Sequence, residues 1–285
     1  MTLDKRLNAF RADLADERLR GKVEASRFVT GKPMQVIDSV IDIRREPRPD
    51  APVDSQALYG ETVLLFEDQE GFGWAQLQTD NYVGYVPMNA LTQTINSASH
   101  IVIAPRTFLY PGADMKFPVT KALSIGSLLT VIGDSETRGT RFLKLASGEF
   151  IIANHARPVA EYSTDPVAVA LRFLETPYQW GGRSAFGIDC SGLVQLSHAL
   201  CGNALPRDSD MLAKSAGHQI GEGADHAPLK CGDLVFWKGH VAFMQDPDTL
   251  LHASGHSMAV VREPYLPALQ RIKAMYGLPT MYRRW

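Results

Sequence analysis

Short β-rich runs separated by turn residues place the strongest limit on how the first part of this chain can fold. The runs are MQVIDSVIDI, TVLLFED, GWAQLQT and YVGYVPM, and the segments between them include RPDAP, YGE, DQEGFG and TDN. Runs of this length with Gly, Pro, Asp and Asn between them are typical of strands joined by tight turns. The spacing predicts a small β-barrel over residues 26–95.

The same pattern of short β-rich runs and turn residues recurs further along the chain. HIVIAPRTFLYPG, SLLTVIG, RFLKLAS and EFIIANHA again read as short strands with Gly, Pro or Asp between them. The similarity to the first group is weak, but the pattern predicts a second small barrel over residues 96–160.

The first 25 residues differ from both groups. Leu3, Leu7, Phe10, Leu14 and Leu19 recur among charged residues at roughly helical spacing. This spacing predicts a short amphipathic helical arm over residues 1–25. The segment has no apolar stretch followed by a small-residue cleavage site, so we expect the protein to stay in the cytoplasm unless a non-classical route exports it.

From residue 161 the pattern changes to helices followed by strands. STDPVAVALRFLET predicts a helix that Thr164 or Asp165 caps, with Val167, Leu171 and Leu174 on one face. A second helix begins in DCSGLV and ends near Gly202. Strand-like runs follow at 233–237, 240–244 and 250–254. Residues 161–285 are therefore predicted to form an α+β domain.

Charge and hydropathy exclude two kinds of partner. The formal net charge of −2 over 285 residues gives no electrostatic basis for nucleic-acid binding. No apolar run approaches the ~20 residues that span a bilayer, and we expect no membrane partner. The oligomeric state is left open by the sequence.

Cys190 is the residue most clearly placed for chemistry. It lies in the first turn of the second predicted helix, where the helix dipole and free N–H groups favour a thiolate. Cys201 lies at the opposite end of that helix and is expected to be a core residue, and Cys231 has no comparable setting. An odd count of 3 cysteines argues against a disulfide framework.

A nucleophilic cysteine needs a base and a group that orients the base. His240 and His252 lie on consecutive predicted strands that can pair as a hairpin, which would place the two imidazoles side by side. Each histidine alone could instead be a hydrogen-bonded structural residue. A metal site built from Cys190, His240, His252 and His256 is the rival reading, but no metal-binding spacing supports it. We therefore expect no metal and no cofactor.

Three sequence blocks resemble the NlpC family of cell-wall cysteine peptidases. They are PYQWGGR with GIDCSGLV, then GDLVFW with GHVA, then LHA, in that order along the chain. The resemblance implies a papain-like fold with Cys190 as nucleophile, His240 as base and His252 orienting it. It also implies that Tyr178 donates to the oxyanion, although Tyr178 could simply pack the wall of the site.

The first predicted barrel resembles the bacterial SH3-like domain of one NlpC subgroup through SQALYGE and YVGYVP. That subgroup cleaves the γ-D-glutamyl bond to a diamino acid in murein peptides with a free N-terminal L-alanine. The resemblance implies that Glu61, Tyr82 and Asp208 bind the alanine ammonium group, with Ser191 and Asp189 lining the pocket. The alternative is that Glu61 and Asp208 are turn or cap residues with solvated charges.

The expected architecture is therefore two SH3-like barrels followed by an NlpC-type peptidase domain. The expected function is hydrolysis of murein-derived peptides in peptidoglycan recycling or turnover. Two alternatives remain from the sequence: a murein-binding protein without activity, and a cysteine amidase or acyltransferase on the same scaffold. The identity of the diamino acid is left open.

Overall fold

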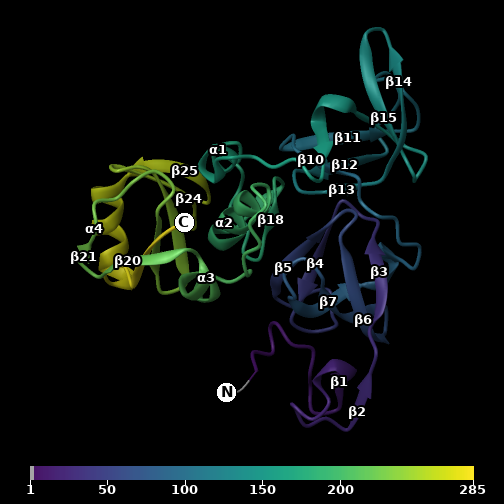
Figure 1. Cartoon of the computed structure of the whole chain (residues 1–285). Helices are drawn as coiled ribbons and strands as arrows, with labels where there is room; N and C mark the ends of the chain where they lie inside the picture. Colours follow the sequence, from purple (N-terminus) through teal and green to yellow (C-terminus); the bar gives the residue numbers. More distant parts are fainter. Residues whose placement is uncertain (1–2) are drawn as a thin grey trace. The chain divides into compact units, whose positions relative to one another are not determined.

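The computed structural model describes residues 3–285 (Figure 1). The chain divides into two compact units, Met1–Glu161 and Tyr162–Trp285, and each is described by itself.

The first unit contains a seven-stranded antiparallel sheet with the order β5-β4-β8-β7-β6-β3-β9. Its core includes Ile41, Val63 and Leu77, which face inward from alternate positions. The Glu70–Gly71 turn joins β6 to β7, and both residues have positive φ (51° and 84°), as a tight hairpin requires. The four predicted runs are confirmed as strands. The elements are β3 (Lys32–Val36), β4 (Val40–Arg44), β5 (Val53–Leu58), β6 (Thr62–Gln69), β7 (Phe72–Leu77), β8 (Val83–Pro87), the 3₁₀ helix η2 (Met88–Ala90) and β9 (Leu91–Thr92).

Residues 100–158 carry two further sheets, with the orders β12-β11-β16-β15-β14 and β13-β10-β17. Val102, Leu109, Leu129 and Ile151 belong to one buried cluster that joins them. The runs predicted here are also strands. The elements are β10 (His100–Val102), β11 (Arg106–Tyr110), β12 (Lys121–Ser124), β13 (Leu128–Leu129), β14 (Val131–Thr137), β15 (Thr140–Leu145), β16 (Phe150–Ile152), η3 (Ala153–His155) and β17 (Ala156–Pro158).

The helical arm predicted for residues 1–25 is wrong over the described residues 3–25. This segment holds β1 (Leu14–Asp16) and the 3₁₀ helix η1 (Glu17–Leu19), and β1 pairs in parallel with β2 (Arg27–Val29). Ala9 and Leu14 are buried in one cluster with Phe66 and Trp74 of the barrel. A short isolated helix is only marginally stable in water, so burial of these apolar side chains against the barrel decides the backbone conformation.

The second unit is α+β, as predicted. Its seven-stranded sheet has the order β21-β20-β26-β22-β23-β24-β25. Alternate residues of β23 face opposite ways, since Ala242 and Met244 join a cluster with α4 whereas Phe243 contacts His198 of α2. Figure 1 shows α2 and α4 on the two sides of this sheet. The elements are α1 (Pro166–Leu171), β18 (Arg183–Ser184), β19 (Gly187–Ile188), α2 (Cys190–Ala199), α3 (Ser209–Ser215), β20 (His218–Glu222), β21 (Asp225–His226), β22 (Leu234–Trp237), β23 (His240–Asp246), β24 (Thr249–Ser254), β25 (Ala259–Pro264), α4 (Tyr265–Tyr276) and β26 (Met281–Arg284).

The first predicted helix of this unit is shorter than its apolar spacing indicates. Asp165 caps α1 by accepting from the Val167 N–H at 2.8 Å, which confirms the predicted start. Beyond Leu171 the N–H groups bond three residues back instead of four, so the last turn tightens. Phe173 is buried as a result, whereas Leu174 is 37% exposed and not on the buried face predicted for it.

The second predicted helix is confirmed as α2, and its residues Cys190 to His198 are all buried. It packs against β23 and β24. The helix therefore lies in the interior of the domain, and its buried polar Gln195 is satisfied by a hydrogen bond from Arg183 at 2.9 Å. Gly202 follows it with a φ of 82°, a conformation that glycine adopts without strain.

His198 is a buried histidine whose ring nitrogens have no hydrogen-bond partner among the described residues. It is 0% exposed and its ring lies against those of Phe243 and Trp285. Burial lowers the pKa of His198 to about 4. The folded unit therefore holds this imidazole neutral at pH values where the unfolded chain would protonate it.

We expect His198 to weaken the fold under mildly acidic conditions. The unfolded chain gains its proton near pH 6.5 and the folded chain only near pH 4, so stability present above pH 6.5 is lost as pH falls through this window. The loss over the whole window is about 3 kcal/mol in the free energy of unfolding, and about 2 kcal/mol of it falls between pH 7 and pH 5. Urea denaturation at pH 7 and pH 5 measures it. His198→Phe should reduce the difference between the two pH values, the exposed His218→Gln should leave it unchanged, and equal differences in all three proteins would contradict the prediction.

Candidate active site

Cys190 is the first residue of α2, as the sequence predicts. The carboxylate of Asp189 caps the helix by accepting from the Gly192 N–H at 2.7 Å. The Cys190 Sγ lies 4.0 Å from the Gly239 carbonyl oxygen, next to the first residue of β23. The thiol is thus directed at the strand that begins with His240.

Burial decides the resting state of the thiol. It raises the pKa of Cys190 to about 12, and the nearby Asp189 charge acts in the same direction. Burial therefore opposes the thiolate that the helix N-terminus favours, and it is the largest cause of the raised pKa. A proton acceptor must take the thiol proton before Cys190 can act as a nucleophile.

His240 and His252 lie side by side on β23 and β24, which confirms the predicted hairpin. The His240 Nε2 is 2.8 Å from the His252 Nδ1. Because this bond occupies Nε2, the nitrogen of His240 that is left for a thiol is Nδ1. Burial, with a smaller contribution from His252, lowers the pKa of His240 to about 3, so its ring is neutral at rest.

The hydrogen-bonded chain continues to two residues that the sequence reading missed. The His252 Nε2 is 2.7 Å from Oε1 of Glu263 on β25. Arg271 of α4 donates to both oxygens of Glu263, at 2.6 Å and 2.7 Å. Burial alone would raise the pKa of Glu263, but the hydrogen bonds from Arg271 and His252 outweigh it and lower this pKa to about 2. Glu263 is therefore an anion at neutral pH.

Tyr178 is brought to the Cys190 turn by its backbone. It forms a parallel bridge with Ile188, and its N–H donates to the Met258 carbonyl at 2.9 Å. Burial raises the pKa of Tyr178, and a charge on Cys190 would raise it further, which places the phenol within electrostatic range of the thiol. The phenol therefore keeps its proton and can act as a hydrogen-bond donor.

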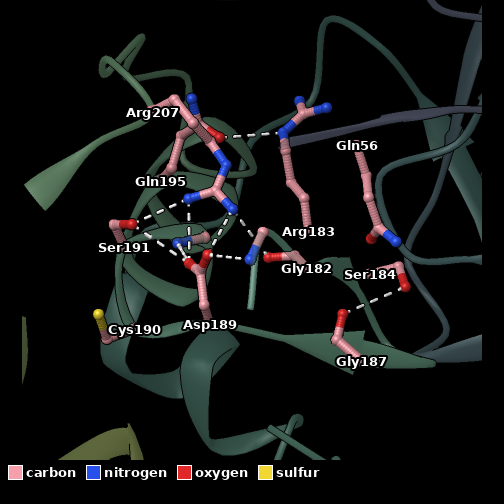
Figure 2. Close-up of polar contacts among 12 residues, drawn as sticks. Gln56, Gly182, Arg183, Ser184, Gly187, Asp189, Cys190, Ser191, Gln195 and Arg207 are labelled. Atoms are coloured by element: carbon pink, nitrogen blue, oxygen red, sulfur yellow. Dashed lines mark hydrogen bonds and ion pairs between the residues drawn. The ribbon is translucent and has the colours of Figure 1, made fainter. Parts of the chain in front are cut away.

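A buried ion pair holds the turn before Cys190. The Arg207 guanidinium, with a side chain only 1% exposed, donates to both oxygens of Asp189 at 2.6 Å and 3.0 Å. It also donates to the Ser191 hydroxyl at 2.9 Å and the Gly182 carbonyl at 3.2 Å. Figure 2 shows the Arg207 side chain over the carboxylate of Asp189, and Cys190 next to Asp189. The sequence pattern predicts no role for Arg207.

These contacts assign a structural task to two residues that were predicted to bind substrate. Asp189 also accepts from the Gly181 N–H at 3.0 Å, and Ser191 donates to Asp189 at 3.2 Å. Both side chains hold the Cys190 turn. The substrate contacts predicted for them stay predictions.

The three predicted ammonium-binding residues lie in different units. In the first unit, Glu61 is 3% exposed and accepts from the Leu58 N–H at 2.7 Å and the Thr79 hydroxyl at 2.6 Å. Tyr82 of the same unit is 4% exposed and belongs to the barrel core. In the second unit, Asp208 precedes α3 without capping it through its side chain. Their meeting at one pocket stays a prediction.

The alternative prediction was a metal site built from Cys190, His240, His252 and His256. Within residues 3–285, His, Cys, Asp and Glu side chains form no group of three or more that could hold a metal ion. No helix in this described part of the chain is both long and apolar enough to cross a bilayer.

Two family models match the chain. The NlpC/P60 family matches residues 175–272, and the bacterial dipeptidyl-peptidase SH3 domain matches residues 43–91. The first match spans Cys190, His240 and His252, and the second spans Glu61 and Tyr82.

Similar proteins extend over most of the chain. A dipeptidyl-peptidase 6 from Lysinibacillus sphaericus is 31% identical over 241 residues, which cover 77% of this chain and 86% of that protein. A gamma-D-glutamyl-L-lysine dipeptidyl-peptidase from Bacillus subtilis is 28% identical over 238 residues, covering 74% and 76%. The crystal structure of an NlpC/P60 family protein from Bacillus cereus superposes with a TM-score of 0.73 at 21% identity, covering 89% of this chain and 99% of that one. The chain belongs to the NlpC/P60 family and carries an SH3 domain before its NlpC/P60 domain.

Proposed function

We propose that this protein is a cysteine peptidase that hydrolyses the γ-D-glutamyl bond to a diamino acid in murein-derived peptides. The observation that carries the proposal is a thiol at the start of a buried helix, 4.0 Å from the carbonyl oxygen of the residue that precedes His240, and a histidine pair joined by a 2.8 Å hydrogen bond. Relatives that align over most of this chain are named as dipeptidyl-peptidases, two of them for the γ-D-glutamyl-L-lysine bond.

The reaction begins with a neutral thiol and a neutral imidazole. The Nδ1 of His240 takes the Cys190 proton, and the thiolate attacks the γ-carbonyl carbon of D-glutamate. The Cys190 N–H and the Tyr178 hydroxyl donate to the oxyanion, where each donor is worth about 10²- to 10³-fold in rate. His240 then returns its proton to the departing amine of the diamino acid. Water, deprotonated by His240, hydrolyses the thioester and frees the thiol.

In this proposal Glu61, Tyr82 and Asp208 are the residues that bind the substrate's ammonium group. A substrate ammonium group removed from water needs an anionic partner and hydrogen-bond acceptors. Glu61 accepts hydrogen bonds from the Leu58 N–H and the Thr79 hydroxyl, which hold its carboxyl group in one orientation. An ammonium held there fixes the substrate by its N-terminus, and the enzyme cuts off the dipeptide L-Ala-D-Glu. Intact glycan-linked stems, whose alanine amine is blocked, are excluded.

The domain arrangement in the proposal is two SH3-like barrels, at residues 26–95 and 96–160, before a peptidase domain at 161–285. The division of the chain after Glu161 supports the last boundary, and the separate buried core of residues 102–151 supports a second barrel. The first barrel supplies Glu61 and Tyr82.

We expect the purified protein to cleave L-Ala-γ-D-Glu-meso-diaminopimelate and to spare its N-acetylated counterpart. Loss of an ammonium–carboxylate pair costs about 2–4 kcal/mol, so kcat/KM should differ by about 30- to 1000-fold. Chromatographic detection of L-Ala-D-Glu measures both rates. Glu61→Gln should slow cleavage of the free-amine peptide alone, and the exposed Glu46→Gln serves as the control.

Two results would contradict parts of the proposal. Equal cleavage of both peptides would retain the cysteine peptidase and exclude the amine pocket. No cleavage of either peptide would exclude the peptidase and favour a murein-binding or acyl-transferring protein.

A further inference from the structure

The histidine pair does not end at His252 but is anchored by a carboxylate–guanidinium pair behind it. His252 has a side chain only 1% exposed, and its Nε2 lies 2.7 Å from Glu263. Arg271 binds the same carboxylate through two hydrogen bonds. The four residues come from three consecutive strands, β23, β24 and β25, and from the helix α4 that follows them.

The chain of hydrogen bonds has only one consistent set of proton positions when the histidines are neutral. An ionised Glu263 can only accept, so the Nε2 of His252 must carry a proton. The Nδ1 of His252 is then a lone pair, so the Nε2 of His240 must carry a proton as well. The Nδ1 of His240 is left unprotonated, and this is the nitrogen available to the Cys190 thiol.

We infer that Glu263, held by Arg271, sets the tautomers of His252 and His240 so that His240 presents an unprotonated Nδ1 to the nucleophile. Both residues act through the histidines and are positioning residues, not catalytic ones. The kinetic consequence rests on the proposed peptidase function, whereas the tautomers themselves do not.

Arg271 has two effects in this arrangement. It keeps Glu263 ionised, because a protonated carboxyl could donate to His252 and reverse every proton position in the chain. It also balances the carboxylate charge: Glu263 favours the protonated form of His240, and Arg271 disfavours it. The charged groups that act on His240 are Glu263 of β25 and Arg271 of α4, and His252 is its titratable neighbour. Arg271 thus opposes the tendency of the Glu263 carboxylate to hold on His240 the proton that the leaving amine needs.

The direct test is the protonation site of each imidazole nitrogen. We expect two-bond ¹H–¹⁵N correlation spectra of the full chain at pH 7 to show His240 and His252 as Nε2–H tautomers. In Glu263→Gln the amide can accept from His252 or donate to it, so both tautomers should appear. Arg271→Lys keeps a cation beside Glu263 and should retain the wild-type tautomers. A wild-type His240 protonated on Nδ1, or spectra unchanged in Glu263→Gln, would overturn the inference.

The kinetic test separates positioning from general stability. Glu263→Gln should lower kcat about 10- to 100-fold with little change in KM, the effect of losing a residue that orients a catalytic histidine. Arg271→Lys should recover most of the activity that Arg271→Gln loses, and the exposed neighbour Arg262→Gln should match the wild type. A Glu263→Gln enzyme with wild-type kcat would overturn the inference. The stated tautomers in a protein that cleaves no murein peptide would support the inference and exclude the proposed function.

Discussion

Replacing Cys190 by alanine is expected to abolish peptide hydrolysis, with a fall in kcat of about 10⁶-fold, the scale found when a hydrolase loses its nucleophile. No other described group lies at the start of α2 to attack the carbonyl, since Ser191 is bound to Asp189 and Arg207. Cys190→Ser should also be nearly inactive, because a serine hydroxyl is a much weaker acid than a thiol and gives up its proton to a neutral imidazole less readily. Release of L-Ala-D-Glu from the free-amine peptide measures the loss.

The other cysteines provide the matched controls for this experiment. Cys231 is exposed and Cys201 is partly buried at the far end of α2, so Cys231→Ala and Cys201→Ala should retain wild-type turnover. Thermal denaturation should place Cys190→Ala close to the wild type, which would separate lost chemistry from lost folding. Turnover by Cys190→Ala at the wild-type rate would show that Cys190 is not the nucleophile.

Arg207→Met is expected to cost about 3–5 kcal/mol in the free energy of unfolding. The substitution keeps the volume of the side chain but leaves the Asp189 carboxylate, 7% exposed, without the guanidinium that donates to both of its oxygens. The Cys190 turn should loosen with it, so kcat should fall too. Urea denaturation of the full chain, followed by circular dichroism, measures the stability.

A surface ion pair gives the comparison for Arg207. Arg45 donates to Asp54 through two hydrogen bonds, but its side chain is 63% exposed. Arg45→Met should therefore cost at most about 1 kcal/mol. In the double variant Arg207→Met with Asp189→Asn, part of the loss should return, because no buried charge is left unpaired. Equal effects of Arg207→Met and Arg45→Met would show that burial of the Asp189–Arg207 pair contributes nothing.

Interactions between residues that are near in sequence predict much of the candidate site. An aspartate before a helix start predicts an N-cap, and Asp189 places Cys190 in the first turn of α2 as expected. Two short strands close in sequence predict a hairpin, and β23 and β24 bring His240 and His252 to a hydrogen bond. Capping and strand pairing of this kind act between residues that are near in sequence, so a pattern of residue types is enough to predict them.

The N-terminal segment shows where this reasoning fails. Its apolar spacing predicts a helix, yet Leu14 lies in a strand and is buried beside Phe66 and Trp74. The spacing of apolar residues is compatible with a helix, but the backbone conformation depends on which one buries these side chains against the rest of the protein.

The sequence by itself determined the place of Cys190 at the helix start, the histidine hairpin and the succession of β-rich and α+β segments. Only the tertiary structure decided that Arg207 supports Asp189, that Glu263 and Arg271 extend the histidine pair, and that the resting thiol is neutral. These facts depend on which side chains meet after folding and on how much water is removed around them. Desolvation and long-range ion pairing are properties of the packed interior, and no periodic pattern in the sequence predicts them.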